Sequence, residues 1–237
     1  EFLCRNGITE VIGDRTLPLL YVDEMQAAGI TVELDANLGV LERRVKDAEE
    51  VEHLRVAQKV TEETMRMACE TIANATADEN GCLQVDGEPL TSERIRIMID
   101  IFLLERSFEN PSSIVAGGID GGDCHEHGTG VLRTGEPIIV DIFPRDSKTL
   151  YSGDCTRTVV HGAIPEEVAR MHAAVIEAKM AATAAMKAGV TGEAMHLETL
   201  RVLKEHGFSE GLPTDSDLDS FCSMPHGTGH GIGLDTH

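Results

Sequence analysis

Two aspartates flanking one polar turn carry the first chemical signal of this sequence. Asp141 lies in the middle of the apolar run IIVDIF, where burying an unpaired carboxylate is costly, so it needs a partner or a metal ion. Asp154 follows 13 positions later, beyond the polar segment DSKT. Facing side chains of a β-hairpin have Cβ atoms about 5 Å apart, and two carboxylates that close repel unless protonated or bridged by cations. A metal site is therefore favoured over the alternative, a solvent-facing or turn-capping aspartate.

Histidines supply the imidazole ligands that complement such carboxylates. The closing segment FCSMPHGTGHGIGLDTH holds His226, His230 and His237, interleaved with glycines. Glycines remove side chains from alternate positions, so the backbone can pass close to a site while the imidazoles point into it. A flexible surface loop is the alternative. His125, in DCHEHGTG, is a fourth candidate, and its neighbour His127 is a weaker one.

The other histidines lie in helical or strand-end contexts and are interpreted as ordinary: His53, His161, His172, His196 and His206. Other catalytic patterns are missing from the sequence. It holds no GxSxG, and no GxxxxGK[ST] phosphate loop. Cys124 and His125 are neighbours in sequence, which does not place a thiol against a base in space. The segment GGIDGG precedes no clear helix, which argues against a dinucleotide site.

Composition narrows the class of protein. The chain has 237 residues, 41% hydrophobic and 26% charged, as in soluble globular proteins. No apolar run approaches the roughly 20 residues that span a bilayer, so no membrane partner is expected. The net charge of −21 argues against nucleic acid as a partner. Six scattered cysteines without a CxxC pair indicate reduced thiols and a cytoplasmic location.

The elements that must position these residues alternate between helices and hairpin-like strands, which predicts an α+β fold. Residues 1–42 are predicted to be the tail of a small α/β domain, and residues 43–237 a partial catalytic domain. The second part opens with a long amphipathic helix over about 43–77. A second helix over 93–106 is capped by Thr91 or Ser92. The runs EPIIVDIFPR and LYSGDCTRTVV form the hairpin, and helices from Pro165 to Gly189 and from Thr191 to Gly207 follow.

Three segments together, IIVDIFP, SGDCTRT and PHGTGHGIGLDTH, resemble the signature segments of the pita-bread metallopeptidases. That family, with the creatinase/aminopeptidase fold, includes Xaa-Pro aminopeptidases, prolidases and methionine aminopeptidases. The resemblance covers about residues 111–237. The helix RRVKDAEEVEHLRVAQKVTEETM also resembles the segment that opens the catalytic domain of this family. The form of the closing segment points to the Xaa-Pro aminopeptidase and prolidase branch.

The resemblance implies a role for each matching position. Asp141, Asp154 and His230 correspond to metal ligands of a two-metal site, with Asp154 bridging. His125 corresponds to the histidine that contacts the scissile amide nitrogen. His237 corresponds to the one that steadies the gem-diolate oxygen, and His226 faces the substrate. The two cations polarise the carbonyl and generate hydroxide near neutral pH. Mn²⁺ or Co²⁺ suits these ligands best, with Zn²⁺ and Fe²⁺ as alternatives.

One departure from the family concerns the ligand set. The family completes its site with two glutamates that come after the segment where this chain ends, and no Glu follows Glu210 here. A C-terminally incomplete fragment of a pita-bread fold, inactive alone, is therefore expected.

For the parent protein the resemblance implies a metal-dependent aminopeptidase or dipeptidase that hydrolyses Xaa-Pro peptide bonds. A peptide substrate is the expected partner, and a homodimer is left open. Alternatives are a non-catalytic peptide- or protein-binding module on the same fold, or creatinase-like C–N hydrolysis.

Overall fold

The computed structural model describes residues 1–214 and 221–236. It divides into two compact units, Glu1–Val51 and Glu52–His237. The boundary predicted from the sequence, after residue 42, lies within the short helix that precedes this division. Among the described residues, no helix is long and apolar enough to cross a membrane.

The first unit is built around a β–α–β arrangement. Its two strands pair in parallel, from Glu10 opposite Thr31 to Gly13 opposite Leu34. Two parallel strands joined by a helix are an α/β arrangement, the class expected for this part of the chain. The elements of this unit are α1 (Phe2–Arg5), β1 (Glu10–Gly13), α2 (Leu19–Ala27), β2 (Thr31–Leu34) and α3 (Val40–Arg44).

The long helix predicted over 43–77 is interrupted near its start. Helix α3 ends at Arg44, and α4 spans Ala48–Ala73. Asp47 accepts a hydrogen bond from the Glu50 N–H at 2.9 Å, and Glu50 accepts one from the Asp47 N–H at 2.8 Å. This reciprocal capping box satisfies donors at a helix N-terminus and therefore starts a new helix within the amphipathic pattern.

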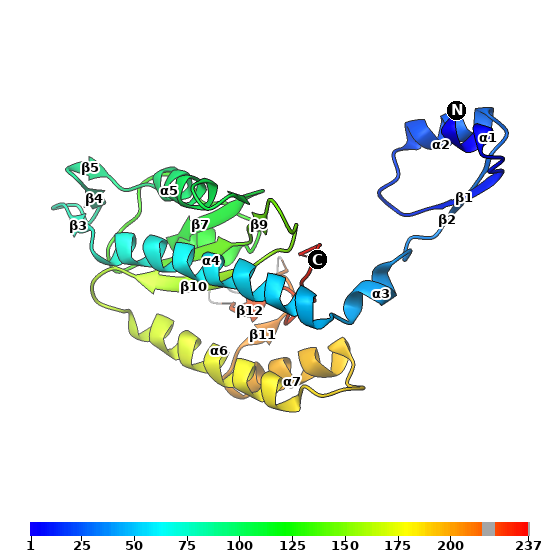
Figure 1. The fold of residues 1–237 in the computed structure, drawn as a ribbon. Coiled ribbons are helices and arrows are strands. Elements are labelled where there is room, and N and C mark those ends of the chain that lie inside the picture. The colour runs from blue at the N-terminus through cyan, green and yellow to red at the C-terminus, as the bar shows by residue number, and fades with distance from the viewer. Residues whose placement is uncertain (215–220, 237) are drawn as a thin grey trace. The chain divides into compact units, whose positions relative to one another are not determined.

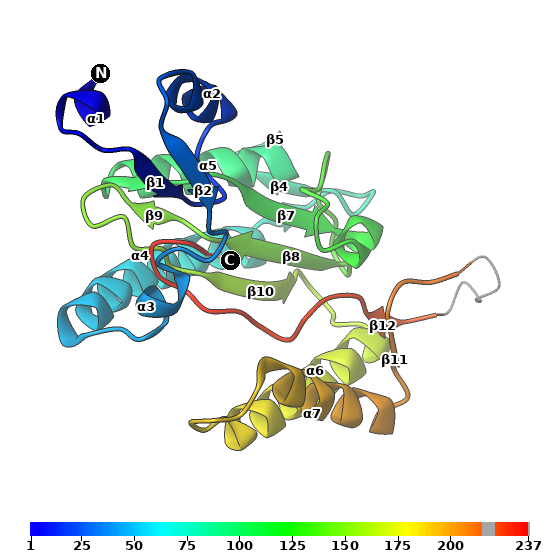
Figure 2. The ribbon, with the colours of Figure 1, turned by 90° about the vertical axis from the view of Figure 1, so that its right-hand side faces the viewer.

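The second unit is organised by an antiparallel sheet in the order β10-β8-β7, with β8 in the centre (Figures 1 and 2). The predicted hairpin between the two apolar runs is confirmed, because β8 and β10 pair antiparallel. The strands and helices around this sheet are β3 (Thr76–Ala77), β4 (Leu83–Val85), β5 (Glu88–Pro89), α5 (Ser92–Leu104), β6 (Phe108–Glu109), β7 (Ser113–Gly117), the 3₁₀ helix η1 (Gly118–Gly122), β8 (Pro137–Ile142), β9 (Arg145–Asp146) and β10 (Cys155–Val160).

One face of this sheet carries the core. Ile138, Val140 and Ile142 alternate along β8 and are fully buried, as the period of two in a strand requires. They join buried side chains of α4 and α5, among them Ile72 and Ile95, in one apolar cluster. Both helices therefore cover the same face of the sheet, as Figure 2 shows. Thr91 caps α5, its hydroxyl accepting from the Arg94 N–H at 3.1 Å.

Two further helices form a hairpin of their own (Figure 1). α6 (Glu166–Ala185) and α7 (Gly192–Glu205) pack through a cluster that includes Ala174, Ala178 and Leu203. Thr191 caps α7, as predicted, whereas α6 ends at Ala185 instead of Gly189, because Met186 already adopts extended backbone angles. The short strands β11 (Ser209–Glu210) and β12 (Ser223–Met224) pair in parallel after α7.

Gly153 lets α4 lie directly against the start of β10. A Cβ atom placed on Gly153 would lie 2.8 Å from the Ala57 carbonyl oxygen and closer still to the Thr61 hydroxyl. Ala57 and Thr61 are completely buried. The small side chains of both elements therefore set the distance between the helix and the residue that precedes Asp154.

We predict that Gly153→Ala lowers the free energy of unfolding by about 1–3 kcal/mol, because the added methyl group forces a packed helix outward. Urea denaturation measures the change. Gly192→Ala is the matched control: nothing lies within 4 Å of a Cβ atom there, and alanine is the better helix former, so no loss is expected. Equal stability of the two variants would contradict this account of the contact.

Candidate metal-binding and peptidase site

Asp141 points away from the core although it lies in the most apolar strand. The neighbours Val140 and Ile142 are fully buried toward α4 and α5, and Asp141, between them, is half-buried on the opposite face. There the Thr156 hydroxyl donates a hydrogen bond of 2.5 Å to Asp141 Oδ1. The carboxylate avoids the free-energy cost of burial because it points away from the core and accepts this hydrogen bond.

The sequence predicted that Asp154 lies directly opposite Asp141 in the hairpin, and this prediction is wrong. Thr156 occupies that position in the register, and Asp154 immediately precedes β10. Because side chains alternate along a strand, Asp154 and Thr156 share a face, so Asp154 is a diagonal neighbour of Asp141. The Asp154 N–H donates to Gln58 Oε1 of α4 at 3.1 Å, which fixes the backbone where the carboxylate starts.

The closing segment returns to this hairpin and brings His230 to Asp154. The Ser152 N–H donates to the Gly233 carbonyl at 2.8 Å, which holds the segment alongside. His230 Nε2 then lies 3.4 Å from Asp154 Oδ2, with the two side chains 37% and 25% exposed. His230 Nδ1 lies 2.9 Å from the Gly231 carbonyl, which can only accept, so Nδ1 carries a proton. In the neutral ring the lone pair is then on Nε2, the atom facing Asp154.

The donor chemistry of these three side chains suits divalent cations. Two carboxylates on one sheet face and an imidazole in contact with one of them are oxygen and nitrogen ligands of intermediate hardness. Asp141, Asp154 and His230 therefore fit a cation-binding role by type and by face. In the described part of the chain, however, the group of three potential ligands whose donor atoms all lie within 4.8 Å of one another is a different one, Asp123, Cys124 and His125.

Of the remaining predicted histidines, the two that the structure describes, His125 and His226, are both exposed. His226 is exposed, and its Nδ1 lies 2.8 Å from the Gly227 carbonyl. His237 lies outside the described residues. His125 is on the exposed loop after η1, where its ring contacts Cys124 and Asp123. The structure therefore joins His230 to the hairpin, and the contacts it gives for His125 lie within the loop itself.

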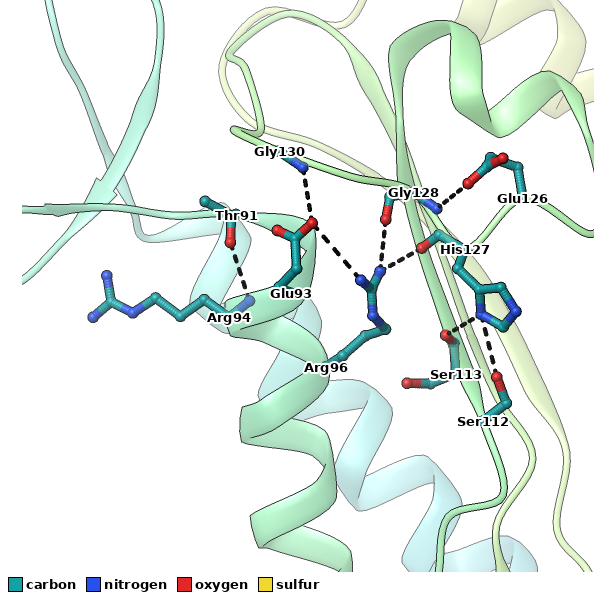
Figure 3. Close-up of polar contacts among 10 residues, drawn as sticks. All are labelled: Thr91, Glu93, Arg94, Arg96, Ser112, Ser113, Glu126, His127, Gly128 and Gly130. Carbon is teal, nitrogen blue, oxygen red and sulfur yellow. Dashed lines mark hydrogen bonds and ion pairs between the residues drawn. The ribbon is translucent and has the colours of Figure 1, made fainter.

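Arg96 of α5 contacts the backbone of His127 and Gly128, as Figure 3 shows. These two residues end the loop that carries His125. The Arg96 guanidinium donates to the carbonyl oxygens of His127 at 2.5 Å and Gly128 at 2.8 Å. Glu93, one turn earlier, accepts from the Gly130 N–H at 3.1 Å. This bond and the bond from its own backbone N–H, the larger cause, hold the pKa of Glu93 below its usual range.

The close contact between this loop and β7 requires a glycine at position 128. Its φ is +75°, and a Cβ atom there would lie 2.7 Å from the Ala116 Cα atom of β7. The Val115 N–H donates to the His127 carbonyl at 3.1 Å. The stem of the loop is therefore pressed against β7, while residues 123–126 project from it.

A cavity of about 990 Å³ adjoins the closing segment. Helices α6 and α7 form one side, with methionines such as Met171 and Met195, and residues 222–231 form the other, including His226 and His230. His196, interpreted from the sequence as ordinary, reaches across: its Nδ1 lies 3.0 Å from the Thr228 hydroxyl. The histidine segment is thus held against α7 as well as against the hairpin.

Four contributors to this site were not found by sequence reasoning: Gln58, Arg96, Thr156 and His196. Each acts through a partner far along the chain, such as Gln58 on the Asp154 backbone, 96 positions away. No spacing in one dimension identifies such a pair. Thr156 alone carried a usable signal, because it lies two positions after Asp154 and therefore shares its face of the strand.

Comparison with known proteins defines the class. Residues 52–237 match the model of metallopeptidase family M24, and the chain belongs to that family. The matched residues coincide with the second compact unit, Glu52–His237. The chain is 30% identical over 233 residues to a probable dipeptidase PepE of Mycobacterium tuberculosis, covering 97% of this chain and 57% of the relative. It is also 30% identical over 222 residues to Xaa-Pro aminopeptidase 1 of Streptomyces coelicolor, covering 88% and 42%.

Solved structures share the fold. The prolidase from Pyrococcus horikoshii aligns with a TM-score of 0.77 at 19% identity, over 98% of this chain and 60% of that one. The X-Pro aminopeptidase from Thermotoga maritima aligns with a TM-score of 0.76 at 21% identity, over 100% and 61%. The predicted α+β, pita-bread fold and the predicted family are confirmed. The chain spans about half the length of the curated relatives it matches.

We predict that Arg96→Ala frees the loop that carries His125. Hydrogen bonds to a charged donor contribute about 1.5–3 kcal/mol, so amide exchange over residues 127–131 should accelerate about tenfold or more. Hydrogen exchange with mass spectrometry measures the rate.

Arg94→Ala is the matched control for this prediction. Arg94 lies on the same helix but donates to the carbonyls of Val85 and Glu88 around β4 and β5. Its loss should loosen that turn and leave residues 127–131 protected. Unchanged exchange at residues 127–131 in Arg96→Ala would show that the backbone contacts with β7 hold the loop alone.

Proposed function

We propose that this chain is part of a metal-dependent peptidase that hydrolyses Xaa-Pro bonds, as an aminopeptidase or a dipeptidase. The observation that carries the proposal is the 3.4 Å contact between His230 Nε2 and Asp154 Oδ2, on the sheet face to which Asp141 also points. Carboxylates and imidazole so arranged are the ligand types of metallohydrolases. The similar relatives named as dipeptidase and Xaa-Pro aminopeptidase support the same reaction class.

In this proposal Asp141, Asp154 and His230 supply three of the ligands for two divalent cations, and the two glutamates that the family uses complete the set. Mn²⁺ or Co²⁺ is preferred, with Zn²⁺ or Fe²⁺ as alternatives. Bound cations of this kind polarise a scissile carbonyl and lower the pKa of a water molecule. The protein orients the ligands: Thr156 holds Asp141 through its hydroxyl, and the Gly231 carbonyl sets the proton of His230 on Nδ1. Such outer contacts fix ligand geometry and metal affinity.

Histidines outside the ligand set act on the peptide. His125 contacts the nitrogen of the scissile bond from the loop that Arg96 anchors. His226 faces the substrate along the cavity beside α6 and α7. His237, outside the described residues, steadies the negative charge that develops on the carbonyl oxygen. Imidazoles suit these tasks because they donate or accept a proton near neutral pH.

The alternative function is a non-catalytic module that binds peptides or proteins in the same cleft. The retained ligands Asp141, Asp154 and His230 favour the enzyme, because a binder has no use for a set of metal-binding side chains. We further propose a cytoplasmic protein with peptide as its substrate and no nucleic-acid partner. The six cysteines form no disulfide, and the net charge is −21, which supports both points.

The test uses the full-length protein, freed of metal by chelation and reloaded with each cation in turn. We expect hydrolysis of Xaa-Pro peptides and much slower hydrolysis of matched Xaa-Ala peptides. Asp154→Asn and His230→Ala should lower kcat/KM by about 100-fold or more, since even outer contacts of metal ligands are worth 10–100-fold. His172→Ala, at an exposed histidine of α6, is the matched control and should keep full activity.

The products separate the two peptidase types. Release of the first residue from a longer peptide indicates an aminopeptidase, and cleavage of dipeptides alone indicates a dipeptidase. Peptide binding without hydrolysis under every cation would overturn the enzyme and support the binding module.

We predict that Thr156→Val weakens metal binding without changing the fold. The substitution keeps the shape of the side chain but removes the hydrogen bond to Asp141, so cation affinity should fall about 10–100-fold. Calorimetric titration of the metal-free protein measures it. Thr158→Val, on the same strand opposite Ile139, is the matched control. Equal affinities of the two variants would mean that Asp141 needs no orienting contact.

A further inference from the structure

A second group of metal-binding side chains lies outside the hairpin. Asp123, Cys124 and His125 are consecutive, exposed, and offer three ligand atoms that all lie within 4.8 Å of one another. The Cys124 Sγ and His125 Nδ1 atoms are 3.6 Å apart, and the Asp123 Oδ1 and His125 Nδ1 atoms are 4.0 Å apart. We propose that these residues form a separate site for a thiophilic divalent cation, with Zn²⁺ as the best match.

The distances suit tetrahedral zinc. With Zn–S near 2.3 Å and Zn–N or Zn–O near 2.0–2.1 Å, tetrahedral geometry places S and N about 3.5 Å apart and N and O about 3.3 Å apart. The first distance is already met within 0.1 Å. The second requires a closure of less than 1 Å, which rotation of two solvent-exposed side chains provides, since the His125 and Asp123 side chains are 91% and 69% exposed.

The backbone holds the three ligands on one side of the loop. The His125 N–H donates to Asp123 Oδ1 at 2.9 Å, which turns the carboxylate toward the imidazole. The Glu126 N–H donates to the Asp123 carbonyl at 3.2 Å and tightens the same turn. The stem behind it is fixed by Arg96 through the carbonyls of His127 and Gly128. A cation would therefore organise only side chains, at little cost in backbone entropy.

The ligand types separate this site from the one on the hairpin. A thiolate is a soft ligand that selects zinc and other thiophilic cations, whereas Asp141, Asp154 and His230 include no sulfur. Cys155, next to Asp154, is buried in the core and faces α4 and α5. The exposed side of the loop leaves room for water as a fourth ligand, as in open zinc sites.

Occupation of this site has a consequence for the proposed peptidase, and this step rests on that proposed function. A cation bound to the His125 ring occupies the imidazole assigned to the scissile amide nitrogen. Excess Zn²⁺ should then inhibit the enzyme through Cys124, while the hairpin cations stay in place. We call this proposed inhibition through His125 a metal-sensitive brake.

Cobalt provides a readout that does not depend on activity. A thiolate bound to Co²⁺ gives a near-ultraviolet charge-transfer band, which a site of carboxylates and imidazole cannot produce. We expect the band when Co²⁺ is added to the reduced full-length protein, and its loss when Zn²⁺, but not Mg²⁺, is added. Burial raises the pKa of the Cys69 and Cys222 thiols, which disfavours a contribution from their thiolates.

Two cysteine variants decide the assignment. Cys124→Ser should abolish the band, whereas Cys4→Ser, at another exposed cysteine, should retain it. Asp123→Asn should lower Co²⁺ affinity about tenfold or more. Circular dichroism verifies that the variants are folded. No band in the folded wild-type protein, or a band that persists in Cys124→Ser, would overturn the site.

Activity then tests the brake separately. Cys124→Ser should keep peptidase activity with Mn²⁺ or Co²⁺ but lose inhibition by excess Zn²⁺. Equal inhibition of the wild type and Cys124→Ser overturns the brake even where the charge-transfer band establishes the site. An inactive full-length protein that shows the band overturns the proposed function and leaves the cation site supported.

Discussion

The alternation of side chains along β8 is the constraint on which the site depends. Because Ile138, Val140 and Ile142 are drawn into the core by α4 and α5, Asp141 must point to the other face. A shift of the strand by one residue would bury the carboxylate and expose three large apolar side chains. The hydrophobic effect that folds the sheet therefore also selects which face carries the chemistry.

The same core fixes the second aspartate through α4. Cys155 is buried with the core, so Asp154 and Thr156 must face outward on either side of it. Gly153 allows α4 to approach, and Gln58 then accepts the Asp154 N–H. The packing of α4 and the register of β8 with β10 together place the carboxylates of Asp141 and Asp154 on the outer face of the sheet. Rigid elements hold ligand side chains more precisely than loops do, which is what a metal-dependent reaction requires.

Sequence reasoning identified the hairpin, the fold class and the family, because these depend on local patterns: apolar alternation, capping residues and short signature segments. It failed on the register, since the facing residue is Thr156 and not Asp154. The hairpin connection contains β9, which pairs with β6 instead of forming a simple turn. It also predicted a single long helix, whereas the capping box of Asp47 and Glu50 starts a new helix, α4, after α3. Contacts between distant positions, such as Arg96 with His127, have no signature along the chain.

The two candidate cation sites differ in how their ligands are held, and that difference determines their selectivity. On the hairpin, hard carboxylates are fixed by a sheet, so affinity depends on a geometry already set by folding. On the loop, three adjacent side chains turn about single bonds, so selectivity must come from the softness of the sulfur. In the two proposals the hairpin takes the catalytic cations, and the thiolate of the loop adds a preference for a thiophilic cation. Under both proposals a thiophilic cation on the loop would restrain the enzyme through His125 without displacing the cations of the hairpin.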